Sequence, residues 1–226
     1  MKPTRRTIPA LFLLAALFPA LVSAPAAGQD RGVLPPTVPI PDVPAPAPPR
    51  PAGAPPAGEG LAVQIPPGWT PLDHVRNAKG EELYLVPPSQ NNPNWKDMIA
   101  YREVKGYSGG SPKSVLEGSL EAGRQGCPGL VFKPIQEGRV NGYPAAFLTV
   151  FCPSDTTGKG GEINLVKVVV GRENLYMVQR TWRTAPFEPT RPPVDSKTID
   201  VWVQYLSRLK PCDTRDPTHP CPVPEK

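Results

Sequence analysis

The sequence is poor in the side chains that carry acid–base and metal chemistry. Only two histidines occur among its 226 residues, His74 and His219. The four cysteines include no Cys-x-x-Cys pair, which indicates neither thiol redox catalysis nor a zinc site with closely spaced ligands. The Gly-x-Ser-x-Gly turn that carries a hydrolase nucleophile is also missing. We therefore predict no catalytic residue, no metal and no cofactor.

A phosphate-binding loop is missing as well, although Gly158-Lys159-Gly160-Gly161 has part of its composition. The motif requires a glycine five residues before the Gly-Lys pair, where this chain has Pro153, and Ser or Thr directly after the lysine. The segment is interpreted as a flexible connection between strands.

Excess charge of one sign is absent from the part of the chain that would fold. The whole chain has a formal charge of +5, but Lys2, Arg5 and Arg6 lie in an N-terminal segment without acids. Without those three residues the charge is about +2, which is too small to indicate nucleic acid or an anionic membrane surface as a partner.

Long apolar runs are confined to the N-terminus. Residues 8–22 are almost entirely apolar, follow a basic segment and precede Ala24-Pro25-Ala26, where small residues suit a signal peptidase. We predict a cleavable signal peptide at residues 1–26 and a mature chain without a transmembrane segment. A retained anchor is the alternative, but the run of about 15 residues is shorter than the ~20 that span a bilayer. The two arginines leave the export route open between the secretory and the twin-arginine pathways.

Residues 27–60 have too little apolar surface to form a core. Eleven prolines lie between Leu34 and Gly58, most of them separated by alanine or a single other residue. Proline fixes φ and removes backbone donors, so we predict a disordered, extended spacer that reaches roughly 75 Å. A docking motif for an aromatic-lined groove is the alternative interpretation.

From residue 61 the pattern becomes that of a globular α+β domain, which we predict over residues 61–210, followed by a C-terminal tail at 211–226. The predicted strands are residues 61–65, 82–86, 98–104, 130–136, 143–151, 163–170 and 175–182. Ser111-Pro112 predicts the start of a helix that ends at Gly123 or Gly126, and a second helix is predicted over residues 195–209. Asn141-Gly142 predicts a two-residue hairpin turn.

Several of these strands are apolar on both faces. Phe147, Thr149 and Phe151 alternate with three apolar residues in the strand at 143–151. A strand with one face in water would alternate more cleanly with polar residues. We therefore predict a single, mostly antiparallel sheet of about seven strands with helices packed on its faces.

The four cysteines lie in the exported part of the chain, where an even number predicts a disulfide framework. Counting outward from the predicted hairpin turn places Cys152 opposite Val131, close to Cys127. Cys212 and Cys221 enclose a short loop without apolar residues. We predict the pairs Cys127–Cys152 and Cys212–Cys221, which stabilise the fold by roughly 3.5 and 2.7 kcal/mol through loop closure.

Three features resemble the PsbP-like fold family, which includes a small Ran-binding protein of eukaryotes and several bacterial envelope proteins. They are Ile65-Pro66-Pro67-Gly68-Trp69, Gly142-Tyr143-Pro144-Ala145-Ala146, and paired strands that lead into a terminal helix with a tryptophan. Together they cover most of residues 61–209. The resemblance implies an accessory or binding protein and carries over no catalytic residue.

Two loops have the composition of contact surfaces. Residues 87–95 contain three asparagines and Trp95, and residues 184–194 follow Arg180 and Arg183. We predict partner contacts at Trp95, Arg180 and Arg183. The other interpretation is that each loop is a rigid connector whose aromatic side chain packs into the core.

The sequence as a whole predicts an exported, periplasmic or extracellular, non-enzymatic binding or accessory protein. An envelope protein or a cell-wall component is the expected class of partner. One alternative is an envelope hydrolase that uses His74 or the dispersed acids, and another is a purely structural envelope component. Asp73 and His74 are adjacent and lack the nucleophile that such a base requires.

Overall fold

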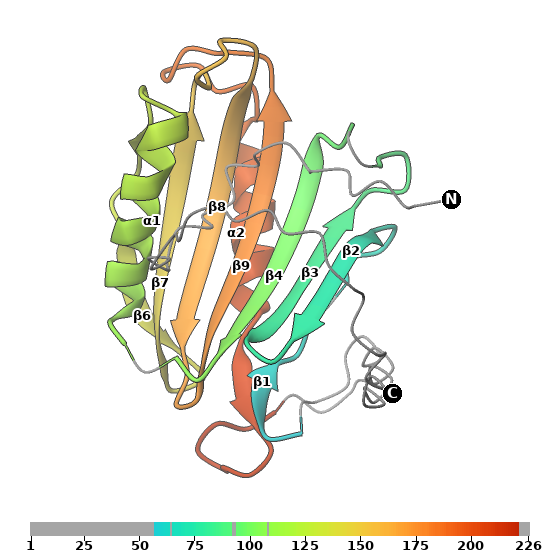
Figure 1. The fold of residues 1–226 in the computed structure, drawn as a ribbon, viewed down its shortest axis with the longest axis vertical. Helices are drawn as coiled ribbons and strands as arrows, with labels where there is room; N and C mark the ends of the chain where they lie inside the picture. Colours follow the sequence, from blue (N-terminus) through green and yellow to red (C-terminus); the bar gives the residue numbers. More distant parts are fainter. Residues whose placement is uncertain (1–56, 64, 92–93, 108, 222–226) are drawn as a thin grey trace, which may run out of the picture.

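An antiparallel sheet of eight strands organises the chain in the computed structural model (Figure 1). The structure describes residues 57–221 except 64, 92, 93 and 108, so the predicted signal peptide and nearly all of the predicted spacer lie outside the described residues. The strand order is β2-β3-β4-β9-β8-β7-β5, and β6 also pairs with β7. The strands are β2 (Thr70–Asn77), β3 (Gly80–Val86), β4 (Asp97–Lys105), β5 (Val131–Phe132), β6 (Gln136–Val140), β7 (Tyr143–Cys152), β8 (Gly161–Val170) and β9 (Asn174–Thr184).

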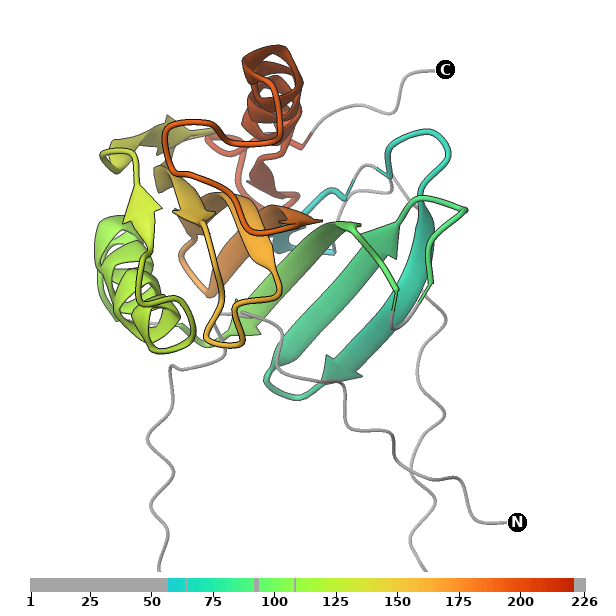
Figure 2. The same cartoon turned by 90° about the horizontal axis from the view of Figure 1, so that it is seen from above.

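Two helices, α1 (Pro112–Gly126) and α2 (Ser196–Arg208), pack on opposite faces of this sheet, and Figure 2 shows them on its two sides. Val166 and Val168 of β8 belong to the core beneath α1, whereas Leu165 of the same strand belongs to the core beneath α2. Successive side chains of a strand point to opposite faces, so the central strands are apolar on both. The predicted arrangement of helices on an antiparallel sheet is confirmed.

Both helices begin at capping residues. The Ser111 side chain accepts a hydrogen bond from the Ser114 N–H at 3.1 Å, with proline in the first turn. The Asp195 carboxylate accepts from the Thr198 N–H at 2.9 Å. Helix α1 continues to Gly126, the later of the two predicted ends.

A lysine from the sheet holds the C-terminal end of α2. Lys167 of β8 donates from Nζ to the backbone carbonyls of Leu206 at 2.8 Å and Leu209 at 2.6 Å. The last carbonyls of a helix have no partner within it and carry partial negative charge, so a cation there is stabilising. Burial lowers the pKa of Lys167 to about 8.

The Asn141-Gly142 turn forms the predicted two-residue hairpin. Both residues have positive φ, 49° and 82°, as a type I′ turn requires. Val140 pairs with Tyr143 across the turn, so β6 and β7 form a hairpin at this point.

The prediction of one continuous strand over residues 130–136 is wrong. The chain forms β5 and β6 with a break between them, and both pair with β7. Across that break the register shifts by one residue, so Val131 pairs with Phe151 rather than with Cys152. Cys127 still reaches Cys152, because the turn before β5 brings it close.

The predictions near the start of the domain need two corrections. The strand expected at residues 61–65 lies earlier, as β1 (Glu59–Leu61), and it pairs with β10 (Pro211–Asp213) in a separate two-stranded sheet. Strand β2 was not predicted at all. Its residues are exposed along almost their whole length, so the sequence carries no apolar alternation there.

The structure contains two disulfides, Cys127–Cys152 and Cys212–Cys221, the pairs that the sequence predicts. Their Cα atoms lie 5.8 and 4.8 Å apart, within the usual range for a disulfide. The first joins the end of α1 to the end of β7. The second closes the loop that follows β10.

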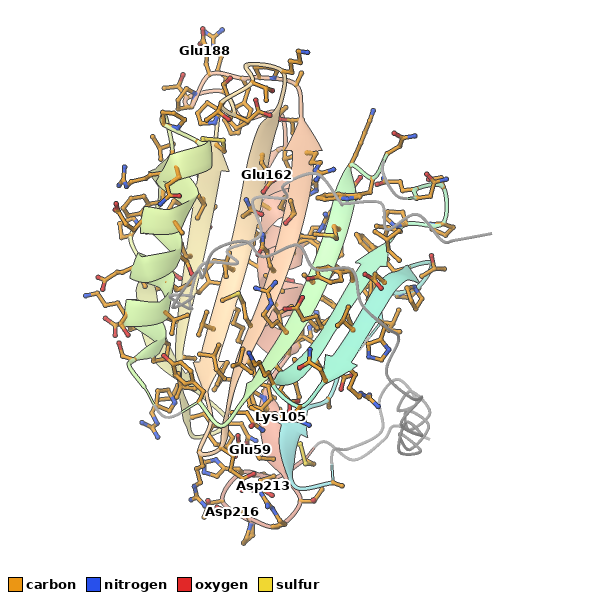
Figure 3. All side chains as sticks on the ribbon, viewed as in Figure 1. Glu59, Lys105, Glu162, Glu188, Asp213 and Asp216 are labelled. Carbon is orange, nitrogen blue, oxygen red and sulfur yellow. A yellow bond between two sulfur atoms is a disulfide. The ribbon has the colours of Figure 1, made fainter. Side chains whose placement is uncertain are left out.

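Glu59 of β1 ties the beginning of the described chain to the β8–β9 turn. Its carboxylate accepts backbone N–H groups from Arg172 at 2.6 Å and Asn174 at 3.1 Å, together with the Tyr176 hydroxyl at 3.1 Å. Figure 3 shows Glu59 beside Asp213, at the end of the molecule opposite Glu162. Such charge-assisted bonds are about twice as strong as neutral ones.

Candidate binding site around Glu162

Opposite charges lie side by side where β8 begins and β9 ends. Glu162 of β8 and Arg183 of β9 are directly paired in the sheet register, so their side chains project from the same face. This is the face on which α1 packs, and Figure 3 labels Glu162 near one end of the sheet.

Glu162 is buried with very little hydrogen bonding. Its side chain is only 7% exposed, and its Oε1 accepts one hydrogen bond, from Asn164 Nδ2 at 2.8 Å. Burial raises the pKa of Glu162 to about 7, against the opposing effects of the Asn164 bond and the positive charge of Arg183. The Glu162 carboxyl group therefore changes between its protonated and ionised forms near neutral pH.

A polar ladder fixes the orientation of the Asn164 amide. Asn164 Oδ1 accepts hydrogen bonds from Gln179 Nε2 and Thr181 Oγ1, both at 2.7 Å. With its carbonyl oxygen engaged on that side, the amide presents its NH2 group to Glu162. The carboxyl is thereby held in one position at the end of the ladder.

A cavity of about 230 Å³ lies beside Glu162, and we call it the Glu162 pocket. Its lining residues are Cys152, Asp155, Gly160, Gly161, Glu162, Arg183 and Thr184. A Cβ on Gly161 would lie 2.8 Å from the Phe187 ring, so glycine is needed there for the close approach of the 184–194 loop. A second cavity of about 30 Å³ lies under α1 beside Ser119 and Glu162, with room for about one water molecule.

Asp155 is a second carboxylate in the lining, in a different environment. Its Oδ1 accepts from the Thr157 hydroxyl at 2.6 Å and from the Thr157 N–H at 2.9 Å. The hydroxyl bond is the main reason that the pKa of Asp155 lies below its usual value. Asp155 is therefore ionised at neutral pH, whereas Glu162 is divided between its two forms.

Arg183 and Trp95, two of the three predicted contact residues, lie against each other. The Arg183 guanidinium is 3.5 Å from the centre of the Trp95 ring, a cation–π stack. Trp95 is only 3% exposed, whereas Arg183 is partly exposed and lines the Glu162 pocket. Burial lowers the pKa of Arg183, and Glu162 opposes that effect.

The loop that carries Trp95 is held by Gln90. The Gln90 Oε1 accepts the backbone N–H groups of Lys96 at 2.6 Å and Asp97 at 2.8 Å, while its Nε2 donates to the Asp97 carboxylate at 2.8 Å. The Arg183 N–H also donates to the Lys96 carbonyl, at 2.7 Å. Trp95 is therefore positioned by Gln90 of its own loop and by the backbone of β9.

Arg180, the third predicted contact residue, lies on the opposite face of the sheet and is 2% exposed. Three tryptophan rings surround its guanidinium, at 4.2 Å for Trp182, 4.6 Å for Trp202 and 5.0 Å for Trp69. It forms an ion pair with Asp97 at 2.5 Å, and burial lowers its pKa to about 10. Arg180 is thus enclosed in the core beneath α2, away from the Glu162 pocket.

Neither histidine lines the Glu162 pocket. His74 lies on β2, where its Nε2 is 2.7 Å from the Glu81 carboxylate, which Arg76 also binds. His219 stacks on Tyr143 with ring centres 3.9 Å apart, in the loop closed by the second disulfide. Sequence reasoning missed Glu162 and Asp155. The sequence signal that could have identified Glu162 is an acidic residue within a strand, β8, whose other residues are almost all buried.

In the part of the chain that the structure describes, residues 57–221 without 64, 92, 93 and 108, no helix is long and apolar enough to cross a bilayer. No group of three His, Cys, Asp or Glu side chains in that same part of the chain is arranged to hold a metal ion. The Glu162 pocket is lined by two acidic residues, Asp155 and Glu162, and by one arginine, Arg183.

The sequence matches no protein-family model and no curated protein. Among solved structures, PA94 of Pseudomonas aeruginosa, a protein of unknown function, aligns with a TM-score of 0.35 and 13% identity over 61% of this chain and 94% of that chain. LpqN of Mycobacterium tuberculosis, described as involved in cell envelope biogenesis, aligns with a TM-score of 0.38 and 14% identity over 69% of this chain and 85% of that chain. At these values neither similarity assigns a role to any residue here.

Proposed function

We propose that this chain is an exported, non-enzymatic binding or accessory protein of the cell envelope, which captures its partner at the Glu162 pocket. The observation that carries the proposal is the pocket itself. A buried carboxyl group with one hydrogen bond faces a cavity next to an arginine that is stacked on a tryptophan. Arginine and tryptophan are the residue types that most often contribute strongly to protein interfaces.

Export is supported by the two disulfides and by the N-terminal sequence. Disulfides persist in oxidising compartments such as the periplasm and are rare in the cytosol. The signal-peptide pattern at residues 1–26 and the proline-rich spacer suit a domain that acts at a distance from its site of export. The resemblance to the PsbP-like family is consistent with an accessory role.

An envelope hydrolase is the second candidate, and one observation favours it. The environments of Glu162 and Asp155 move their pKa values in opposite directions, as happens when one carboxyl acts as acid and another as base. The pocket of about 230 Å³, however, is smaller than the roughly 300–1,000 Å³ of typical ligand sites. A site of this size suits one chemical group of a partner better than a whole substrate.

Site-specific photo-cross-linking in the producing cells tests the proposal. A photoreactive residue replaces Lys159, which is exposed next to the Gly160 lining of the pocket, and the control replaces the exposed Val201 on α2. We expect an adduct with an envelope component from position 159 only. Arg183→Ala should reduce its yield about 10-fold or more. Equal adducts at both positions, or an adduct unaffected by Arg183→Ala, would contradict the proposal.

A further inference from the structure

Glu162 has an acceptor oxygen that no described residue uses. Oε1 accepts from Asn164, and no hydrogen bond or ion pair within the described chain reaches Oε2, although the residue is more than nine-tenths buried. Among the described residues, the fully enclosed polar side-chain atoms without a partner are the Tyr143 hydroxyl and Arg180 Nε. Oε2 is therefore not sealed off, and the Glu162 side chain lines both the Glu162 pocket and the smaller cavity under α1.

The nearest candidate donor is directed elsewhere. Arg183 is paired with Glu162 in the sheet register, yet the two form no ion pair within 4.0 Å, and the guanidinium lies over Trp95. A buried carboxylate usually accepts several hydrogen bonds, because each oxygen carries two lone pairs. Oε2 of Glu162 therefore has no hydrogen-bond donor among the described residues, although Arg183 lines the same pocket.

Two further acceptors line the same cavity. Asp155 contributes a carboxylate whose Oδ2 would lie 3.1 Å from a Cβ on Gly160, the residue beside it in the lining. Thr184 uses its hydroxyl hydrogen on the Ala185 carbonyl at 2.7 Å, which leaves its oxygen lone pairs for a ligand. The pocket thus presents acceptors from Glu162, Asp155 and Thr184, with two carboxyl groups against one guanidinium.

We propose that the Glu162 pocket binds a primary ammonium group, whose three N–H donors match these three acceptors. The inference rests on the proposed function and names the chemistry by which the partner is recognised. A guanidinium fits less well, since its planar fork binds best to both oxygens of one carboxylate, and Oε1 of Glu162 already accepts one hydrogen bond from Asn164. A quaternary ammonium has no N–H donor to offer. The group comes from a lysine side chain or from a free amino terminus.

Titrations followed by amide NMR shifts test this on the purified mature protein. The probes are Nα-acetyl-lysine amide for the lysine side chain, alanine amide for the amino terminus, and tetramethylammonium as a cation without donors. We expect one of the two primary amines to shift the Gly160, Gly161 and Thr184 amides, with a dissociation constant in the millimolar range because the ligand is small. Tetramethylammonium should leave them unchanged.

The variant Glu162→Gln removes the charge and keeps the shape, and Glu188→Gln is the matched control at an exposed acid near the same end of the molecule (Figure 3). Amine affinity should fall at least about 10-fold in Glu162→Gln and stay the same in Glu188→Gln. The affinity of the wild type should also rise between pH 5.5 and 8. Asp155 and Arg183 are the charged side chains that face Glu162, and α1 adds only the uncharged Ser119, Leu120 and Gly123.

Equal binding of tetramethylammonium, or equal amine affinity in Glu162→Gln and the wild type, would overturn the ammonium site. The absence of any shift with either primary amine would overturn it as well. These outcomes are distinct from a failure of the proposed function. If cross-linking at position 159 depends on Arg183 while amines do not bind, the binding function stands and the partner chemistry is different.

Discussion

Replacing Glu162 with glutamine should make the protein more stable at neutral and alkaline pH. Burial is the main reason that the folded protein disfavours the ionised form of this carboxyl. Glutamine has the same shape and keeps an oxygen for Asn164 Nδ2, which donates to Oε1 of the glutamate. The substitution therefore removes the buried charge and preserves the end of the polar ladder.

The magnitude follows from the difference between the two pKa values of Glu162. The folded value is about 7 and the unfolded value is 4.5, a gap of about 2.5 units, which corresponds to about 3 kcal/mol. Because the folded pKa is raised, the folded state binds more protons than the unfolded state between these values. The contribution of Glu162 is therefore fully present below pH 4.5 and is lost as the pH rises through 7.

Urea unfolding at several pH values between 4.5 and 8 measures this directly, by linear extrapolation to zero denaturant. The free energy of unfolding of Glu162→Gln minus that of the wild type should be near zero at pH 4.5 and about 3 kcal/mol at pH 8. Glu188→Gln, at an exposed acid, should track the wild type throughout. Parallel curves for Glu162→Gln and the wild type would show that the carboxyl is ionised in the folded protein without cost, and the argument from burial would fail.

Three further outcomes follow from the structure. A chain that begins at Gly58 should have the same melting temperature in calorimetry as the full mature protein. Glu59→Ala in that shortened chain should lower the free energy of unfolding by about 1.5–3 kcal/mol, because Glu59 accepts several buried hydrogen bonds. Arg180→Ala should cost about 3–5 kcal/mol in urea unfolding, because it empties the tryptophan cage and leaves its acidic partner without a counter-charge. His74→Ala should leave partner capture intact while Arg183→Ala weakens it, both with unchanged circular dichroism; loss of capture in a folded His74→Ala protein would favour the hydrolase.

Local patterns predicted much of this fold because they depend on neighbouring residues. Asn141-Gly142 forms a type I′ turn through its own backbone preferences. Ser111 caps α1 by accepting a hydrogen bond from the backbone N–H of Ser114, three residues further along the chain. Both disulfides follow from counting along one hairpin and one loop. Strand β2, which is exposed along almost its whole length, escaped prediction because an edge strand in water has no apolar pattern to reveal it.

The site could be predicted only in part, because it depends on contacts between distant segments. Loop composition predicts Trp95 and Arg183 as contact residues, and the structure brings them into a stack. Arg180 is three residues from Arg183 in the same strand, and the alternation of side chains sends it to the other face. The burial of Glu162 depends on the register of β7, β8 and β9 and on the position of α1. A single acidic residue in the sequence reveals neither of these.

The pairing of β1 with β10 determines how the domain would respond to mechanical tension. Strands β1 and β10 lie together at the end of the molecule opposite Glu162 (Figure 3). The strands are antiparallel, with Glu59 opposite Asp213 and Leu61 opposite Pro211. Because the Cys212–Cys221 disulfide carries a load from the C-terminal end directly to Cys212, a force that pulls the two ends apart would act at the Gly60–Cys212 pair, in the middle of this ladder. Glu59 also binds the β8–β9 turn, so part of the load would reach the eight-stranded sheet through that contact, at the end farthest from the Glu162 pocket.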